Sequence, residues 1–264
     1  MQDLKVSIVQ SDLAWRDPER NLQHFDALIA SITEPTDLIV LPEMFTTGFT
    51  MQPESLAEDV KSTTLKWMLG KAAEKQCAVM GSYIVVEDGK YLNRLYVVLP
   101  NGESFFYDKK HLFRMAEEDK FFTPGNERLV VKLKGWKLNL QICYDLRFPV
   151  WCRNSYKAGE YDFDCQIFIA NWPEIRNHAW KTLLTARAIE NQSYVVGVNR
   201  IGSDGNGISH SGDSMVIDPW GAKISETLPH QELVETITLS AGKLESFRKN
   251  ITFGLDWDKF ELKQ

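Results

Sequence analysis

The sequence lacks the segments that mark several large classes of protein. None of its apolar runs approaches the ~18 residues that a membrane helix needs, and the first ten residues alternate apolar and polar side chains, unlike a signal peptide. Acidic residues outnumber basic ones, 36 against 30, for a formal net charge of −6, whereas binding to a nucleic-acid backbone needs a basic face. We therefore expect small-molecule partners, and neither a membrane nor a nucleic acid.

Cysteine is scarce. The chain has four in 264 residues, Cys77, Cys143, Cys152 and Cys165, and no two have the CxxC spacing. This pattern argues against a disulfide framework and predicts reduced thiols in the cytoplasm. At least one of these thiols is then a candidate for chemistry.

Several catalytic signatures are also missing. The five histidines are scattered, none forms HExxH, and no Cys/His set has zinc spacing. There is no Walker A motif, no GxGxxG after the first predicted strand and no GxSxG. Metal-dependent, nucleotide-dependent and Ser-His-Asp chemistry therefore lack support.

The composition and patterning that remain are those of a globular α/β protein. Hydrophobic residues make up 44% and charged residues 25% of the chain, and no repeat or linker divides it. Alternation predicts a strand at 4–10, and Asp17-Pro18 predicts a helix start. Further strands are predicted at 37–41, 78–86, 91–99, 104–107, 130–133, 138–143, 166–170 and 194–199, with two or three more near the end, and further helices at 64–75, 178–190 and near 244–248. Strands, helices and hairpin turns at Asp88-Gly89 and Asn101-Gly102 interleave, which predicts one layered domain with mixed sheets.

Cys143 stands where a predicted strand ends abruptly in the polar turn Tyr144-Asp145. A nucleophile at the carboxyl end of a strand is exposed, and the backbone N–H of the next residue is free to face an oxyanion. The alternative is a buried, inert thiol, and that is our interpretation of the other three cysteines.

Two further charged residues follow predicted strands. Glu43 comes directly after 38–42 and before the apolar Met44-Phe45, a setting that disfavours the ionised carboxylate and suits a general base or acid. Lys109 ends the β-rich run 105–109. The polar stretch 108–128 is predicted to be a long loop, and loops of that length are usually functional. Taken singly, the alternatives are a solvated loop glutamate and a surface lysine.

Taken together, these residues resemble the nitrilase (carbon–nitrogen hydrolase) superfamily, which carries a Glu–Lys–Cys triad in this order. The motifs are Leu41-Pro42-Glu43, Tyr107-Asp108-Lys109-Lys110-His111-Leu112-Phe113 and 141–149, with further matching segments at 170–173, 187–192, 212–214 and 217–221. The resemblance spans residue 4 to about 240. It selects Lys109 over Lys110, because the family lysine lies two residues before the His of this motif.

A second glutamate belongs to the pattern of many members, six residues before a Pro-Gly. Glu118 holds that position ahead of Pro124-Gly125. A plain acidic loop residue is the alternative interpretation of Glu118, and both stay open.

The resemblance implies a four-layer α-β-β-α sandwich of the nitrilase type, a single carbon–nitrogen hydrolase domain over residues 1–264, a homodimer, and no metal or organic cofactor. It implies that Cys143 forms a thioester while Glu43 moves the protons. Lys109 and the N–H of Tyr144 are implied to stabilise the oxyanion, and Glu118 to orient Lys109 or the substrate amide.

Within the superfamily, residues 44–49 and 111–119 look most like the bacterial omega-amidase branch, which opens the terminal amide of 2-oxoglutaramate and related monoamides such as 2-oxosuccinamate and succinamate. The expected pocket wall is Phe45, Phe113 and Trp172. A substrate carboxylate beside that wall needs a cation or several N–H donors.

We expect Arg176 to be that cation in preference to Arg114, with backbone amides as a further possibility. Arg147 is expected to pair with an acid, because of the family's Asp-x-Arg-Phe context. The alternatives for the activity are nitrile hydrolysis, N-carbamoyl hydrolysis or another aliphatic amidase on the same triad, or a binding protein without turnover.

Overall fold

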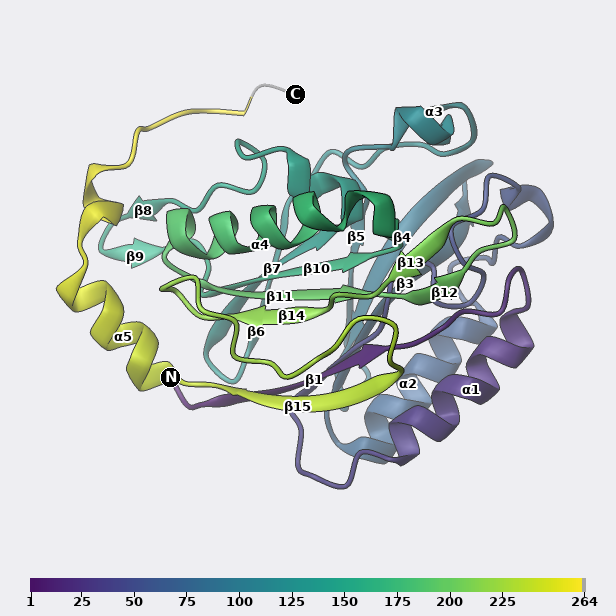
Figure 1. Ribbon diagram of the computed structural model, residues 1–264, viewed down its shortest axis with the longest axis horizontal. Coiled ribbons are helices and arrows are strands. Elements are labelled where there is room, and N and C mark those ends of the chain that lie inside the picture. The colour runs from purple at the N-terminus through teal and green to yellow at the C-terminus, as the bar shows by residue number, and fades with distance from the viewer. Residues whose placement is uncertain (263–264) are drawn as a thin grey trace.

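The computed structural model describes residues 1–262, and most of its strands belong to two large mixed sheets (Figure 1). The first sheet contains β1 (Leu4–Gln10), β2 (Leu38–Val40), β3 (Ala78–Glu87), β4 (Lys90–Val98), β5 (Ser104–Asp108) and β15 (Leu233–Leu239), in the order β15-β1-β2-β3-β4-β5. The second contains β6 (Leu129–Leu133), β7 (Trp136–Ile142), β10 (Cys165–Ala170), β11 (Tyr194–Asn199) and β14 (Met215–Ile217), in the order β14-β11-β10-β7-β6.

The helices are α1 (Pro18–Ala30), α2 (Thr63–Lys75), α3 (Glu118–Phe121), α4 (Asn177–Asn191) and α5 (Ala241–Asn250). Helices α1, α2 and α4 cover the outer faces of the sheets, and α5 packs against the core between them. Helix α1 begins as the sequence predicts, since the Asp17 side chain accepts a hydrogen bond from the Arg20 N–H and Pro18 opens the first turn. Within residues 1–262, α4 is the longest helix at 15 residues, and no helix is both long and apolar enough to cross a membrane.

Because side chains alternate between the two faces of each sheet, the apolar interior consists of three hydrophobic cores. Val6 and Ile8 of β1 face the second sheet and pack in one core with strands β7, β10 and β11. The intervening Val9 faces the other way, into a core shared with α1 and α2. On the far side, α4 packs on the outer face of the second sheet, and Figure 1 shows it running alongside those strands. The arrangement is α-β-β-α, so the predicted fold class is confirmed.

Strand direction places the candidate residues at one edge of this sandwich. Strands β1, β2 and β3 run parallel, and β5 runs parallel to β3 because two antiparallel pairings separate them. Strands β7, β10 and β11 are likewise parallel. Glu43 follows β2, Lys109 follows β5 and Cys143 follows β7, so each stands just beyond the carboxyl end of its strand.

The sequence prediction missed short elements. The polar stretch 108–128, predicted as a loop, contains a 3₁₀ turn at Arg114–Ala116 and helix α3. The hairpins β8 (Tyr156–Lys157) with β9 (Glu160–Tyr161), and β12 (Ile201–Ser203) with β13 (Ser209–Ser211), were also not predicted as strand pairs. Elements of two to four residues are too short to show a period.

Candidate active site

Cys143 stands at a sharp turn between strand and helix. It follows β7 directly, opens the 3₁₀ segment Cys143–Arg147, and has a φ of +43°. A non-glycine residue in the left-handed region stores strain, which the surrounding structure must hold. The thiol is partly exposed and lines a cavity of about 590 Å³. The next N–H, that of Tyr144, belongs to the first turn of the 3₁₀ segment, where N–H groups have no acceptor within the helix.

Glu43 is fully buried, and three groups fix its carboxylate. Oε1 accepts hydrogen bonds from Asn93 Nδ2 at 2.8 Å and from Lys109 Nζ at 2.9 Å. Oε2 accepts one from the backbone N–H of Asn171 at 2.8 Å. The Asn171 side chain also donates to the Glu43 carbonyl oxygen. The carboxylate is therefore held in one orientation, and its charge acts on the Cys143 thiol.

Lys109 is buried between two carboxylates. Its Nζ lies 2.9 Å from Glu43 Oε1 and 3.0 Å from Glu118 Oε2, and 4.9 Å above the Phe49 ring. Burial alone would lower the pKa of Lys109, but the charges of Glu118 and Glu43 outweigh it and raise the pKa, so the ammonium stays protonated. Glu118 Oε2 also accepts a hydrogen bond from the Phe113 N–H at 2.6 Å.

Burial and the neighbouring carboxylates determine whether the Cys143 thiol is protonated. Burial raises the pKa of Glu118, although Lys109 opposes the shift. Burial, then the charge of Glu43, raises the pKa of the Cys143 thiol well above its usual range, against the pull of Lys109. The resting sulfur is therefore a neutral thiol, and it needs a base at the moment of attack.

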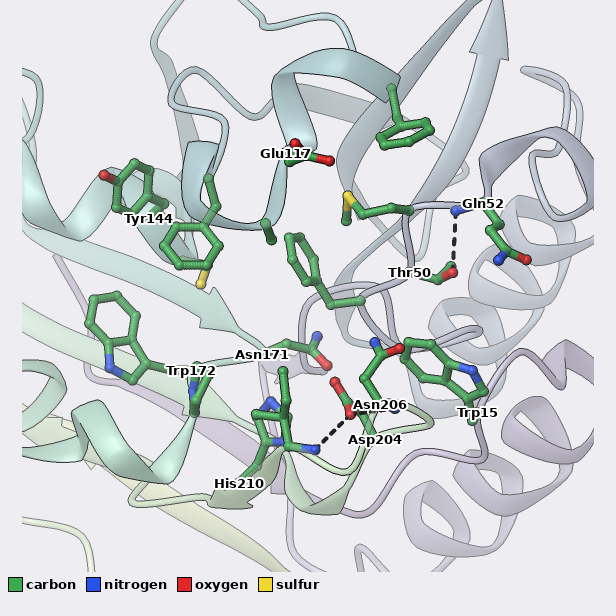
Figure 2. Close-up of a pocket in the computed structure, with 18 of the residues that line it drawn as sticks. Trp15, Thr50, Gln52, Glu117, Tyr144, Asn171, Trp172, Asp204, Asn206 and His210 are labelled. Carbon is green, nitrogen blue, oxygen red and sulfur yellow. Dashed lines mark hydrogen bonds between the residues drawn. The ribbon is translucent and has the colours of Figure 1, made fainter.

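The cavity beside Cys143 is long and has a wall of mixed chemistry. Figure 2 shows Tyr144 and Trp172 towards one end, Trp15, Asp204 and Asn206 towards the other, and Asn171 between them. Phe113, Trp172 and Arg176, which the sequence analysis named for the substrate pocket, are among the residues that line it.

Three arginines line this cavity, Arg16, Arg147 and Arg176, and the last two lie over aromatic rings. The guanidinium of Arg147 lies 4.8 Å from the Trp172 ring, and that of Arg176 lies 5.2 Å from the Phe113 ring. Burial, and then the charge of Arg147, lowers the pKa of Arg176. Within the described residues 1–262, neither side chain forms a salt bridge. Two cations on aromatic faces, neither of them paired with an acid among the described residues, form a site prepared for an anion.

Three predictions about the pocket are wrong. Phe45 does not line the cavity, because it packs on the opposite face of the first sheet, against Phe25 and Trp67. Arg114 is 82% exposed and pairs with Asp119 at 3.0 Å, because the 3₁₀ turn after Phe113 directs it to solvent. Arg147 was expected to pair with an acid, and it lines the cavity instead.

Sequence reasoning also missed two asparagines that hold Glu43. Asn171 belongs to a motif that was noticed, but its contact with Glu43 joins residues 128 positions apart. Asn93 is a buried polar residue in the middle of β4, next to the buried Arg94 and between the apolar Leu92 and Leu95. That interruption is the signal that could have singled out Asn93.

Comparison with known proteins gives one consistent result. Residues 5–249 match the family model described as carbon–nitrogen hydrolase. The chain is 44% identical over 264 residues to an omega-amidase of Escherichia coli K12, covering 99% of this chain and 100% of that protein. It is 34% identical over 225 residues to a 2-oxoglutaramate amidase of Bacillus subtilis, covering 84% and 85%.

A solved structure agrees with these relatives. A CN-hydrolase superfamily protein from Xanthomonas campestris, with an arsenic adduct in its active site, superposes with a TM-score of 0.97 at 44% identity, covering all of both chains. The predicted resemblance is therefore confirmed.

Proposed function

The chain belongs to the carbon–nitrogen hydrolase family and hydrolyses amides, and from that premise we propose that its substrates are short dicarboxylate monoamides of the 2-oxoglutaramate, 2-oxosuccinamate or succinamate type. The observation that carries this choice is the unpaired pair Arg147 and Arg176 in the cavity of Cys143. Relatives named for omega-amides at 44% and 34% identity support the same class.

In the proposed mechanism, Cys143 is the nucleophile and Glu43 its base. The Sγ atom attacks the amide carbon while the thiol proton passes to Glu43, whose charge already acts on the thiol. As the C–N bond breaks, Glu43 gives this proton to the nitrogen, and ammonia leaves. Glu43 then takes a proton from water as the water attacks the thioester, and returns it to the departing sulfur, so the acid is released and the enzyme is restored.

The oxyanion of each tetrahedral intermediate needs donors that are already in place. We assign this role to Lys109 Nζ and the backbone N–H of Tyr144. Glu118 is the positioning group, because its two oxygens lie 3.0 and 3.1 Å from Lys109 Nζ. Because Lys109, Glu43 and Glu118 interact closely, pH profiles will report the set and not one residue.

The two arginines supply the anchor for the far end of the substrate. A carboxylate placed between Arg147 and Arg176 would relieve the repulsion between two like charges. Phe113 and Trp172 lie under these guanidiniums and provide the apolar wall for the methylene chain between carboxylate and amide.

Charge preference tests this assignment. We expect the parent enzyme to prefer succinamate or 2-oxoglutaramate over an uncharged amide of equal length. Arg147→Ala and Arg176→Ala should each raise KM for the charged amide by about tenfold or more, since charge-assisted hydrogen bonds contribute about 1.5–3 kcal/mol. Ammonia release with both substrates measures the ratio.

The exposed Arg114→Ala is the matched control and should leave that ratio unchanged. A parent enzyme without preference for the carboxylate would contradict the dicarboxylate proposal and leave a general amidase. Release of ammonia from nitriles or N-carbamoyl amino acids, in preference to amides, would favour the other chemistries of this triad.

We also propose that residues 1–264 act as one catalytic domain in a cytoplasmic homodimer. Segments that follow strands of both sheets line the cavity, with Lys109 after β5 and Cys143 after β7. The four cysteines are free, which suits a reducing compartment. Exposed apolar side chains such as Trp220 and Ile189 offer a surface for a second copy. Sedimentation equilibrium would measure the oligomeric state.

A further inference from the structure

Asp145 is a fully buried carboxylate that the mechanism above does not use. Four donor groups converge on it. Its Oδ2 accepts hydrogen bonds from the Tyr107 hydroxyl at 2.8 Å and from the Ile142 N–H at 3.0 Å. Its Oδ1 accepts one from the His111 N–H at 3.0 Å and lies 2.7 Å from His111 Nδ1. A buried charge of this kind is retained only where its hydrogen bonds are complete.

These donors come from two segments that meet at the active site. Tyr107 belongs to strand β5 of the first sheet and stands two residues before Lys109, and His111 stands two residues after Lys109, beyond the strand. Ile142 is the last residue of β7 in the second sheet and directly precedes Cys143. One carboxylate therefore ties the lysine segment to the nucleophile turn across the two sheets.

Tyr107, the donor that precedes Lys109, is itself held in place by its neighbours. Tyr107 is buried in the core between the sheets, and its hydroxyl oxygen accepts hydrogen bonds from Trp151 Nε1 at 3.1 Å and from the Lys110 N–H at 3.3 Å. Burial, then the charge of Asp145, raises the pKa of Tyr107 well above its usual range, so its hydroxyl remains a donor to Asp145.

The same carboxylate bears on the strained backbone of Cys143. Cys143 has a φ of +43°. Asp145 belongs to the 3₁₀ segment that follows this residue, and its side chain accepts a hydrogen bond from the N–H of Ile142, the residue before it. Unfavourable backbone conformations persist only where neighbouring interactions over-determine them.

We propose that Asp145 is a positioning residue that sets the placement of Lys109 Nζ relative to Cys143 Sγ. This inference rests on the roles proposed above for these two residues. Asp145 itself touches no reacting atom; it acts through the two segments that it joins.

Asp145→Asn is the direct test. The amide can turn either way, but its NH₂ group then meets the N–H of Ile142 or of His111, so one buried donor loses its acceptor. We expect kcat for the amide substrate to fall about 100-fold, the scale that a displacement of about 1 Å costs, with KM changed less than threefold. Tyr107→Phe, which removes one donor and keeps the ring in the core, should lower kcat by about three- to tenfold.

Asp164→Asn is the matched control. Asp164 is another buried carboxylate, and it accepts the Lys137 N–H at 3.0 Å near the opposite end of β7 while pairing with Arg248 at 2.6 Å. This variant should lower the melting temperature as much as Asp145→Asn does, with kcat within threefold of the parent. Equal kcat losses in the two variants would reduce Asp145 to a stabilising residue and overturn the proposal.

Combination with Lys109→Ala completes the test. Because Asp145 acts through the placement of Lys109, adding Asp145→Asn to Lys109→Ala should slow the enzyme less than tenfold further. If the double variant lost the full product of the two single-variant reductions in kcat, the inference would be contradicted. Normal turnover in Lys109→Ala itself would instead contradict the proposed function, and normal turnover in Asp145→Asn alone would contradict only the positioning role.

Discussion

Replacement of Cys143 by serine is expected to keep the fold and to abolish nearly all turnover of amide substrates. The two side chains are almost isosteric, and the residue lies at the cavity, where no packing is lost. The thiol pKa is already raised by burial and by the charge of Glu43, and a serine hydroxyl is far less acidic than a thiol. A carboxylate base such as Glu43 then has too little driving force to produce the attacking oxygen anion.

The measurement is ammonia release under saturating substrate, with circular dichroism to verify folding. Serine at each of the other cysteine positions, Cys77, Cys152 and Cys165, should retain kcat, because all three are buried away from the cavity. Their expected cost is limited to stability, from a hydroxyl in apolar surroundings. Activity of Cys143→Ser within tenfold of the parent would disprove the assignment of the nucleophile.

Replacement of Lys109 by alanine is expected to lower kcat on the order of 100-fold or more, as the loss of an oxyanion donor does. The change also leaves Glu43 and Glu118 facing each other in a buried site without their cation, and breaking such a pair costs about 3–5 kcal/mol of stability. Lys109→Arg keeps the charge but places its donors elsewhere, because a planar guanidinium does not substitute for a point ammonium. It should fold and be equally slow.

The adjacent Lys110 is the control for this experiment. Its Nζ lies 5.4 Å from the Trp151 ring and has no contact with Glu43 or Glu118, so Lys110→Ala should cost about 1 kcal/mol of stability at most and leave the rate near normal. Steady-state rates and melting temperatures of both variants decide the matter. A slow Lys110→Ala beside a normal Lys109→Ala would mean that the lysine is assigned one residue too early.

Local patterning was sufficient for the main elements, whereas the proposed triad followed from the resemblance to the nitrilase superfamily. The alternation in 4–10, the cap at Asp17 and the abrupt end of a strand before Cys143 are short-range features, and the structure has them where the sequence predicts. Their physical basis is local, because side-chain period, capping and turn chemistry depend on neighbours a few residues away. The glutamate, lysine and cysteine could therefore be singled out by strand ends and by motif.

Only the tertiary structure decided which side chains surround these residues. Arg147 lies over Trp172 without an acidic partner and Phe45 faces the helices, and the sequence suggested the opposite for both. The contacts of Glu43 with Asn93 and Asn171, and of Asp145 with Tyr107 and His111, join residues 34 to 128 positions apart. Such contacts depend on how two sheets stack and which way each turn leaves its strand, and no local period encodes that geometry.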